Sequence, residues 1–204
     1  MSFYSSWLFP RMLDLVMRQK QMVPFRQQIG KAAAGRVLDV GIGSGLNLPF
    51  YGNQIDRVVG VDPSPELLRF AEERARETSN SVDLLCGSGE ALPIEDHSID
   101  TAVVTFTLCT VDSAAATLAE IRRVLTPSGT LLFAEHGRAP EPGVARWQDR
   151  LTPVWRRIAG GCHLNRKPDD LIRSAGYRID RLETGYLKGP RPMVFVYSGS
   201  ARPI

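Results

Sequence analysis

Three glycines and two carboxylates in the first third of the chain have the spacing of a nucleoside-binding site. An apolar run at 37–40 leads into a turn of alternate glycines, and a second apolar run ends on Asp62. The glycines are Gly41, Gly43 and Gly45. Glycine lets the backbone turn sharply and approach a ligand closely, and an acid at the end of the next strand accepts the hydroxyls of a ribose. The pattern predicts a strand, a glycine turn and a second strand that together bind a nucleoside cofactor.

The residue after the third glycine distinguishes between such cofactors. A dinucleotide site has the pattern G-x-G-x-x-G, and its last glycine would fall at position 46, where the chain has Leu46. The chain instead combines Asp39 with the three glycines as D-x-G-x-G-x-G. The sequence therefore argues against a nicotinamide cofactor.

Alternating strand and helix signals follow the glycine turn and would position its residues. The almost uniformly apolar run at 100–106 is typical of a strand covered on both faces. Strands are predicted at 37–40, 58–62, 82–86, 100–106, 130–134, 177–182 and 193–197, the last two as an antiparallel edge hairpin. Helices are predicted at about 46–52, from 64 onwards, and at 112–125, 144–159 and about 168–175. The expected fold is α/β and Rossmann-like, with a seven-stranded, mostly parallel sheet and helices on both faces.

The N-terminal segment reads as helical over residues 3–29, where apolar residues recur at helical spacing. Basic residues lie among them: Arg11, Arg18, Lys20 and Arg26. Two interpretations stay open for residues 1–30. The segment is either a lid that packs on the core at 35–204, or a helix that lies on an anionic membrane surface.

Composition sets broad limits on the class of protein. A length of 204 residues fits one domain spanning 1–204, and a net charge of +3 is too small to indicate a nucleic-acid partner. The three cysteines share no CxxC spacing, which fits a reducing cytosol, and no metal site is expected. No apolar run approaches the ~20 residues of a membrane span, and no signal peptide is visible. A cytoplasmic location is therefore expected.

Several motifs in order resemble the class I S-adenosylmethionine-dependent methyltransferases. Besides the glycine turn and Asp62, the chain has GSGEALP at 87–93 and a helix-turn-strand with Pro-x-Gly at 118–132. The resemblance implies S-adenosyl-L-methionine as cofactor and S-adenosyl-L-homocysteine as product, with Asp39 or nearby carbonyls meeting the cofactor ammonium. Many relatives have Asp where this chain has Ser88, which removes their carboxylate contact to adenine. The implied cofactor-binding residues are Asp39, Gly41, Gly43, Gly45, Asn47, Asp62, Pro63, Ser88, Gly89, Glu90, Thr105 and Leu108.

A narrower resemblance covers nearly the whole chain. The segments 105–111, 132–136 and 160–166, with Trp147 and Trp155 between them, look like the methyltransferase-like 7 proteins, which include membrane-associated thiol S-methyltransferases of animals. The chain lacks the long apolar anchor of the animal proteins, so a soluble or peripheral relative is expected. The resemblance implies methylation of a small, lipophilic thiol. The alternative is C-, O- or N-methylation of a quinone precursor or a phospholipid headgroup.

Methyl transfer to a thiol needs a thiolate and a water-poor pocket. A free thiol has a pKa of about 8.5, so an imidazole could assist its deprotonation. His136, directly after a predicted strand, is the preferred base, although thiol methylation can proceed without one. Candidates for the acceptor pocket are Cys109, Trp147, His163 and Arg166. Convergence of Cys86, Cys109 and Cys162 into an arsenic-binding group is not expected, because Cys86 is predicted to be buried in a strand.

Methylation of a nucleic-acid base is disfavoured by the residues after the predicted strand 100–106. Such enzymes usually carry an Asn/Asp/Ser-Pro-Pro-aromatic run there, whereas residues 105–108 read TFTL. The chain also has no basic stripe. A small-molecule acceptor is therefore expected, and the sequence does not determine the oligomeric state.

Overall fold

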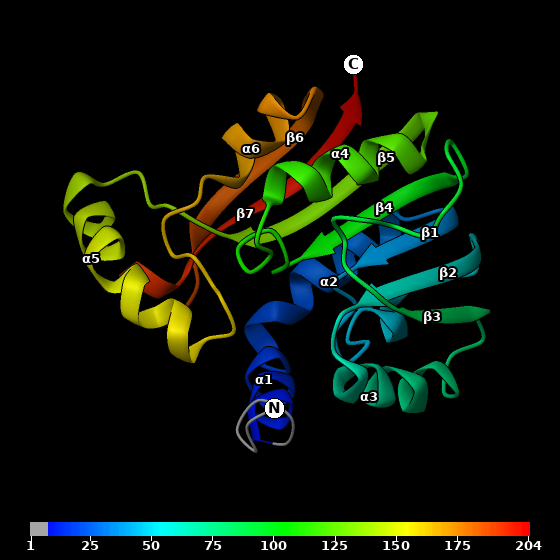
Figure 1. The fold of residues 1–204 in the computed structure, drawn as a ribbon, viewed down its shortest axis with the longest axis horizontal. Coiled ribbons are helices and arrows are strands. Elements are labelled where there is room, and N and C mark those ends of the chain that lie inside the picture. The colour runs from blue at the N-terminus through cyan, green and yellow to red at the C-terminus, as the bar shows by residue number, and fades with distance from the viewer. Residues whose placement is uncertain (1–7) are drawn as a thin grey trace.

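Seven strands form one sheet in the order β3-β2-β1-β4-β5-β7-β6 (Figure 1). The computed structural model describes residues 8–204, so Trp7 and the rest of 1–7 lie outside the described part. The strands are β1 (Gly35–Val40), β2 (Ile55–Asp62), β3 (Val82–Cys86), β4 (Ile99–Thr105), β5 (Leu125–His136), β6 (Tyr177–Tyr186) and β7 (Phe195–Pro203). All seven predicted strands are confirmed, and β7 alone runs antiparallel to both of its neighbours, β5 and β6.

The strand order reverses between β1 and β4. Chain connections leave β1 toward β2 and β3 on one side, and return to β4 and β5 on the other. In open sheets of this kind, ligands bind outside the carboxyl ends of the strands at the reversal. We therefore expect the ligand site at the carboxyl ends of β1, β2 and β4.

Helices cover both faces of the sheet and create two apolar layers. On one face, α4 (Ala114–Val124) and α6 (Pro168–Ser174) contribute Leu118, Ile121 and Ile172 to a cluster of fully buried side chains. On the other face, α2 (Val23–Ala32) and α3 (Pro65–Ala75) contribute Ile29 and Leu68 to a second cluster. These helices form where predicted because Ser64 and Ser113 cap α3 and α4, each accepting a hydrogen bond from a backbone N–H in the first turn.

The prediction of a helix at about 46–52 is wrong. The glycine turn is followed only by the short 3-10 turn η3 (Leu48–Phe50). Pro49 removes a backbone donor, and Tyr51 then adopts an extended conformation, with φ −72° and ψ 124°. This conformation lets the Tyr51 hydroxyl reach the buried carboxylate of Asp39, which a continued helix would not.

The described part of the N-terminal segment is helical, as predicted, and consists of two helices. α1 (Phe9–Met17) and α2 are separated by the 3-10 turn η2 (Lys20–Met22), and Pro24 lies in the first turn of α2. At the opposite side of the strand ends, α5 (Pro142–Ile158) extends away from the sheet, and a short turn η4 (Arg191–Met193) contacts it (Figure 1). Among residues 8–204, no helix combines the length and the apolar character needed to cross a bilayer.

Candidate active site

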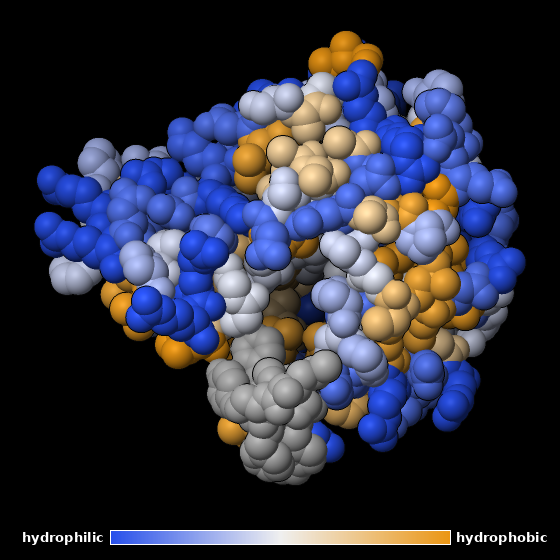
Figure 2. Space-filling view, in the orientation of Figure 1, coloured by the Kyte–Doolittle hydropathy of each residue, from blue (hydrophilic) through white to orange (hydrophobic). Residues whose placement is uncertain are grey.

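A cavity of about 560 Å³ opens at the carboxyl ends of β1, β2 and β4. Its size lies within the range of about 300–1,000 Å³ typical of small-molecule sites. Its wall is built from the glycine turn, the ends of β2 and β4, the loop after β3, the segment after β4, α1, and the end of α5. Figure 2 shows the corresponding hollow near the middle of the viewed face.

The three glycines of the turn have different structural roles. All three have positive φ: 69° at Gly41, 56° at Gly43 and 77° at Gly45. A Cβ at Gly41 would lie 2.4 Å from the hydroxyl oxygen of Thr107, so glycine lets the turn pack against the segment after β4. Gly41 and Gly43 line the cavity, whereas Gly45 lies behind it, where a Cβ would meet the Ala71 backbone of α3 at 3.0 Å. Gly45 is therefore a packing residue and not a wall of the cavity.

Asp62 presents a fixed carboxylate to the cavity. One oxygen accepts a hydrogen bond from the Gly43 N–H at 3.0 Å, and the other accepts from the Ser64 N–H at 2.9 Å. Burial raises the pKa of Asp62, and these two bonds oppose that rise. Each carboxylate oxygen has a second lone pair, so the group can still accept hydrogen bonds from a ligand. Pro63, the next residue, also lines the cavity.

Asp39 is the centre of a buried polar network beneath the glycine turn. One carboxylate oxygen accepts from the Tyr51 hydroxyl at 2.7 Å and from the Asn47 amide at 3.0 Å. The Asn47 amide nitrogen also donates to the Thr105 hydroxyl at 3.1 Å. The Asn47 amide oxygen accepts from the Arg26 guanidinium at 2.8 Å. Burial raises the pKa of Asp39 to about 6. In the described part of the chain, its second oxygen is buried without a hydrogen-bond partner.

The sequence does not indicate two residues of this network. Its pattern places Arg26 among the basic residues of a surface or lid helix, but Arg26 is buried and reaches across to Asn47. The same pattern predicts a helix at Tyr51. No local sequence pattern marks either residue, because their partners are contacts between different elements.

The loop after β3 closes the cavity at its other end. Ser88, Gly89 and Glu90 all line it, and a Cβ at Gly89 would lie 2.7 Å from a methyl carbon of Val40. The Ser88 hydroxyl accepts from the Glu90 N–H at 3.1 Å, and the Glu90 carboxylate accepts from the Ser113 N–H at 2.7 Å. Both side chains therefore hold the loop as well as facing the cavity.

Residues after β4 form the part of the wall that packs beside the glycine turn, and Glu135 holds them. The buried carboxylate of Glu135 accepts from the N–H groups of Thr107, Leu108 and Cys109 at 2.8, 3.0 and 3.3 Å. Burial raises the pKa of Glu135 to about 7, and these three bonds oppose the rise. The Glu135 carboxylate is thus fully buried and engaged with the backbone after β4. It shapes the backbone from which Phe106, Thr107 and Thr110 face the cavity.

Comparison with known proteins agrees with this geometry. Residues 38–133 match the methyltransferase domain family. The chain is 35% identical to human thiol S-methyltransferase TMT1B over 174 residues, which are 82% of this chain and 71% of that protein. It is 30% identical to the ubiquinone/menaquinone biosynthesis C-methyltransferase UbiE of Syntrophotalea carbinolica over 172 residues, 80% of this chain and 72% of that protein. The chain belongs to the class I S-adenosylmethionine-dependent methyltransferases.

The chain spans only part of the length of its relatives, and its fold is shared with solved structures. The match to rat TMT1B is 35% identical over 151 residues, 72% of this chain and 62% of that protein, so the chain spans about two thirds of these relatives. The crystal structure of a putative methyltransferase of Bacillus halodurans superposes on this chain with a TM-score of 0.72 at 17% sequence identity. It covers 89% of this chain and 99% of that one. At this identity the likeness shows the fold alone.

The residues of the cavity fit the methyl donor of this family, S-adenosylmethionine. Asp62 is placed to accept the ribose hydroxyls, and the glycine-lined turn allows close approach of the methionine portion. Asp39 is fully buried beneath the glycine turn and does not itself line the cavity, so its carboxylate would act on the cofactor ammonium through its charge and not by direct contact. When bound, the cofactor supplies an electrophilic methyl group on a sulfonium. Asn47, Pro63, Ser88, Gly89, Glu90 and Thr105 line the same cavity.

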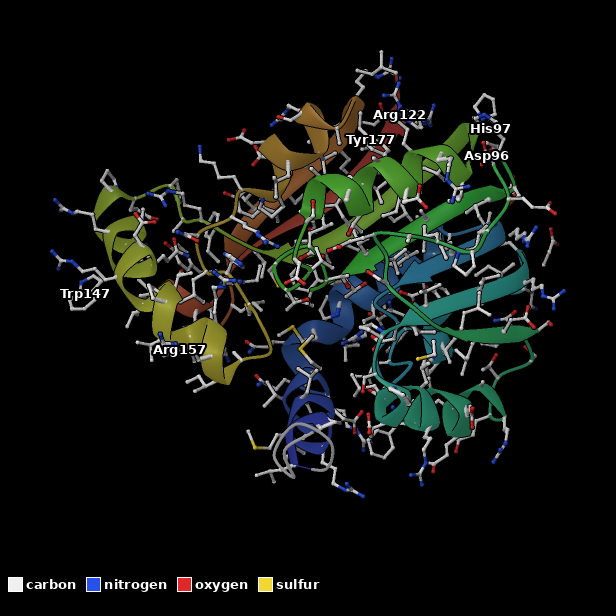
Figure 3. All side chains as sticks on the ribbon, viewed as in Figure 1. Asp96, His97, Arg122, Trp147, Arg157 and Tyr177 are labelled. Carbon is white, nitrogen blue, oxygen red and sulfur yellow. The ribbon has the colours of Figure 1, made fainter. Side chains whose placement is uncertain are left out.

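Several sequence-predicted site residues lie elsewhere. Leu108 is buried behind the wall and does not line the cavity, because its N–H is held by Glu135. Trp147 is 56% exposed on the outward side of α5, far from the strand ends (Figure 3). Arg166 does not face the acceptor end, since its guanidinium donates to the carbonyls of Leu108, Val111 and Asp112. The structure therefore does not bring these three side chains to the cavity wall.

His163 and Cys109 also lie outside the cavity wall. The His163 N–H donates to the Cys109 carbonyl at 2.7 Å, so this loop packs on the segment after β4. Cys109 is buried and turns away from the cavity toward Cys162 and His136. A hydrogen bond with Cys162 raises the pKa of the Cys109 thiol and lowers the pKa of the Cys162 thiol. Cys86, expected to be buried, is exposed at the end of β3.

The first helix closes one side of the cavity. Leu13, Asp14 and Met17 of α1 line it, which supports the lid interpretation of the N-terminal segment. Asp14 accepts from Arg74 of α3 at 2.8 Å, and Arg74 also donates to the Ser44 carbonyl in the glycine turn. Arg74 therefore ties α1 to the glycine turn.

Replacing Arg74 by alanine should weaken the packing of α1 against the cavity. We expect faster amide hydrogen exchange in α1 and a several-fold weaker affinity for S-adenosylmethionine, since a half-buried ion pair and a carbonyl contact contribute on the order of 1–2 kcal/mol. Arg76→Ala is the control, because Arg76 is exposed at the end of the same helix. Equal rates of amide hydrogen exchange in α1 for both variants would show that Arg74 does not hold α1 in place.

Proposed function

We propose that this protein transfers the methyl group of S-adenosylmethionine to the sulfur of a small-molecule thiol. The methyltransferase domain match ends at residue 133, whereas the alignment with human TMT1B extends over 174 residues. It therefore includes residues beyond the cofactor half of the chain, on the side that faces the acceptor. The name of that relative supports a thiol acceptor for this chain.

The observation that carries the proposal is the chemistry of the cavity wall. Among the described residues that line the cavity, there is no histidine, cysteine, lysine or tyrosine. Its ionisable residues are Asp14, Arg26, Asp62, Glu90 and Asp112. The first four are engaged with protein groups, and Asp112 is exposed at the rim. The wall thus offers no neutral base to a weakly acidic acceptor. A thiol, with a pKa of about 8.5, supplies its own anion near neutral pH.

The wall also suits the charge change of the reaction. Attack of a thiolate sulfur on the methyl carbon breaks the bond to the sulfonium, so opposite charges disappear in the transition state. A pocket with little water favours such a step. Met17, Phe106, Val111 and Gly160 supply apolar or small surfaces to the cavity wall. They exclude water and hold the acceptor in line.

His136 as general base stays a prediction. Its imidazole is 6% exposed and lies behind the wall, with Nδ1 3.9 Å from the Cys162 sulfur. If it is the base, His136→Gln would lower the rate most below the pKa of the acceptor thiol and least above it. A pH-rate profile that keeps its shape in the variant would remove the role.

The test of the proposal is transfer of a labelled methyl group to a panel of acceptors. The panel holds alkyl thiols of increasing chain length, a quinol and phosphatidylethanolamine vesicles, each with wild type and Asp62→Ala. We expect label in the thioether of lipophilic thiols, with Asp62→Ala at background. Transfer to the quinol or the lipid without transfer to any thiol would overturn the proposal. The similarity to UbiE makes a quinone precursor the second candidate.

We also infer that the protein works in the cytoplasm at a membrane surface. Exposed apolar side chains gather on α1 and α5, namely Met12, Leu15, Val16, Val154 and Ile158. Apolar atoms are visible over the end of α5 in Figure 2. Arginines of the same helices would face anionic headgroups. Such a location would bring lipophilic acceptors to the cavity that α1 borders.

Leu15→Asp should weaken binding to vesicles that contain anionic lipid. Leu15 is 71% exposed, so the change removes an inserted side chain and adds a like charge without disturbing the core. About tenfold weaker partitioning is expected in a sedimentation assay, from loss of roughly 1.5 kcal/mol of apolar transfer. Leu182→Asp, on the edge strand β6, is the control. Failure of wild type to bind any vesicle would contradict the membrane location.

A further inference from the structure

Three side chains with soft-metal ligand atoms meet behind the cavity wall. Cys109 lies in the turn after β4, His136 is the last residue of β5, and Cys162 lies in the loop after α5. Their ligand atoms all lie within 4.8 Å of one another, and the Cys162 sulfur is 3.9 Å from Nδ1 of His136. The predicted reaction uses neither cysteine, and the sequence spacing did not indicate that they meet.

We propose that Cys109, His136 and Cys162 bind a thiophilic metal ion of the zinc class. Thiolate and imidazole are the ligands that zinc prefers, with bonds of about 2.3 Å to sulfur and about 2.0–2.1 Å to nitrogen. In a tetrahedron with these bonds, the ligand atoms lie about 3.6–3.8 Å apart. The cluster therefore reaches metal-binding geometry by shifts of at most about 1 Å, which rotation of side chains can supply.

The imidazole of His136 provides independent support. In the described part of the chain, Nε2 is buried and has no hydrogen-bond partner, and Nδ1 has only its long contact with the Cys162 sulfur. A buried polar atom without a partner is unfavourable by about 1–3 kcal/mol. Within residues 8–204, the only hydrogen-bond contact of the ring is thus with Cys162, which is itself one of the three candidate ligands.

The backbone around the cluster is held in place without a metal. Glu135 fixes the Cys109 N–H, and the Cys109 carbonyl accepts from the His163 N–H, next to Cys162. Arg166 donates to the carbonyls of Leu108 and Val111, which joins the same two loops a second time. The two cysteines therefore face each other because their backbones are bonded together, and the site is preorganised for a third partner.

A bound ion would have two consequences for this fold. It would crosslink the loop after α5, which supplies Gly160 to the cavity wall, to the ends of β4 and β5. Three protein ligands leave one position of a tetrahedron open, as in zinc sites that bind a small ligand. A metal-bound His136 could not act as base, so the metal and base roles of this residue exclude each other.

The proposal is tested by adding Co²⁺ to the reduced, metal-free protein under anaerobic conditions. We expect one equivalent to bind, with a thiolate-to-cobalt charge-transfer band in the near ultraviolet and visible bands typical of a tetrahedral ion. Zn²⁺ should displace the Co²⁺ and abolish both. This measurement does not use methyl transfer, so it can fail while the proposed function holds, and the reverse.

Single substitutions identify the ligands. Cys109→Ser and Cys162→Ser should each bind cobalt at least tenfold more weakly and lose most of the charge-transfer band, and His136→Ala should keep the band at reduced affinity. Cys86→Ser should match wild type, because Cys86 is exposed on β3. Thermal unfolding of each variant separates ligand loss from misfolding. Absence of cobalt binding by reduced wild type overturns the proposal. So does a Cys109–Cys162 disulfide whose reduction restores no metal binding.

Discussion

Asp62→Ala should weaken binding of S-adenosylmethionine by at least about 100-fold. The carboxylate is placed to accept two charge-assisted hydrogen bonds from the ribose, and each contributes roughly 1.5–3 kcal/mol. The substitution also removes the acceptor that Gly43 and Ser64 share, so the glycine turn loses its link to the end of β2. Titration calorimetry with S-adenosylmethionine and S-adenosylhomocysteine measures the loss.

Asp56→Ala is the matched control for this measurement. Asp56 lies on the same strand, is exposed, and has the same charge at the opposite end of β2. It corrects for the change in net charge, which by itself affects binding of a cationic cofactor. If Asp62→Ala binds within about threefold of wild type, Asp62 does not hold the ribose. If the wild type binds neither compound, the assignment of this cavity to the cofactor is wrong.

The affinity for S-adenosylmethionine should fall about tenfold when the pH is lowered from 7 to 5. Burial raises the pKa of Asp39 to about 6, so its carboxylate is mostly ionised at pH 7 and mostly protonated at pH 5. The cofactor carries an ammonium and a sulfonium, and these positive charges favour the ionised form. The contribution is thus present above pH 6 and lost as the pH falls through it.

Asp39→Asn should remove this pH dependence and bind weakly throughout. The amide oxygen can still accept from Tyr51 and Asn47, so the network keeps its hydrogen bonds while the charge is lost. Asp100→Asn serves as the control, because Asp100 lies on β4 at the opposite end of the sheet and is exposed. A tenfold pH effect that persists in Asp39→Asn would assign the titration to another group.

The cofactor half of the protein could be predicted from its sequence because its signals are local. Gly41, Gly43 and Asp62 lie within a few residues of the strands that carry them, and a strand with a glycine turn imposes its geometry on its own neighbours. The alternation of strands and helices predicts the mostly parallel sheet, whereas the order of its strands comes from the structure. The helix expected at 46–52 does not form, because Pro49 removes a backbone donor and the extended Tyr51 instead reaches Asp39.

The sequence by itself determined the class of fold and the methyl donor of the family. Only the tertiary structure decided what surrounds the acceptor. Arg166 proved to hold a loop, Glu135 to cap a turn, and Cys109 to face Cys162 and His136. These contacts join residues 26 to 58 positions apart, and their pairing depends on how α5 and the strand ends pack. Local periodicity carries no information on such contacts, because any spacing along the chain is compatible with them.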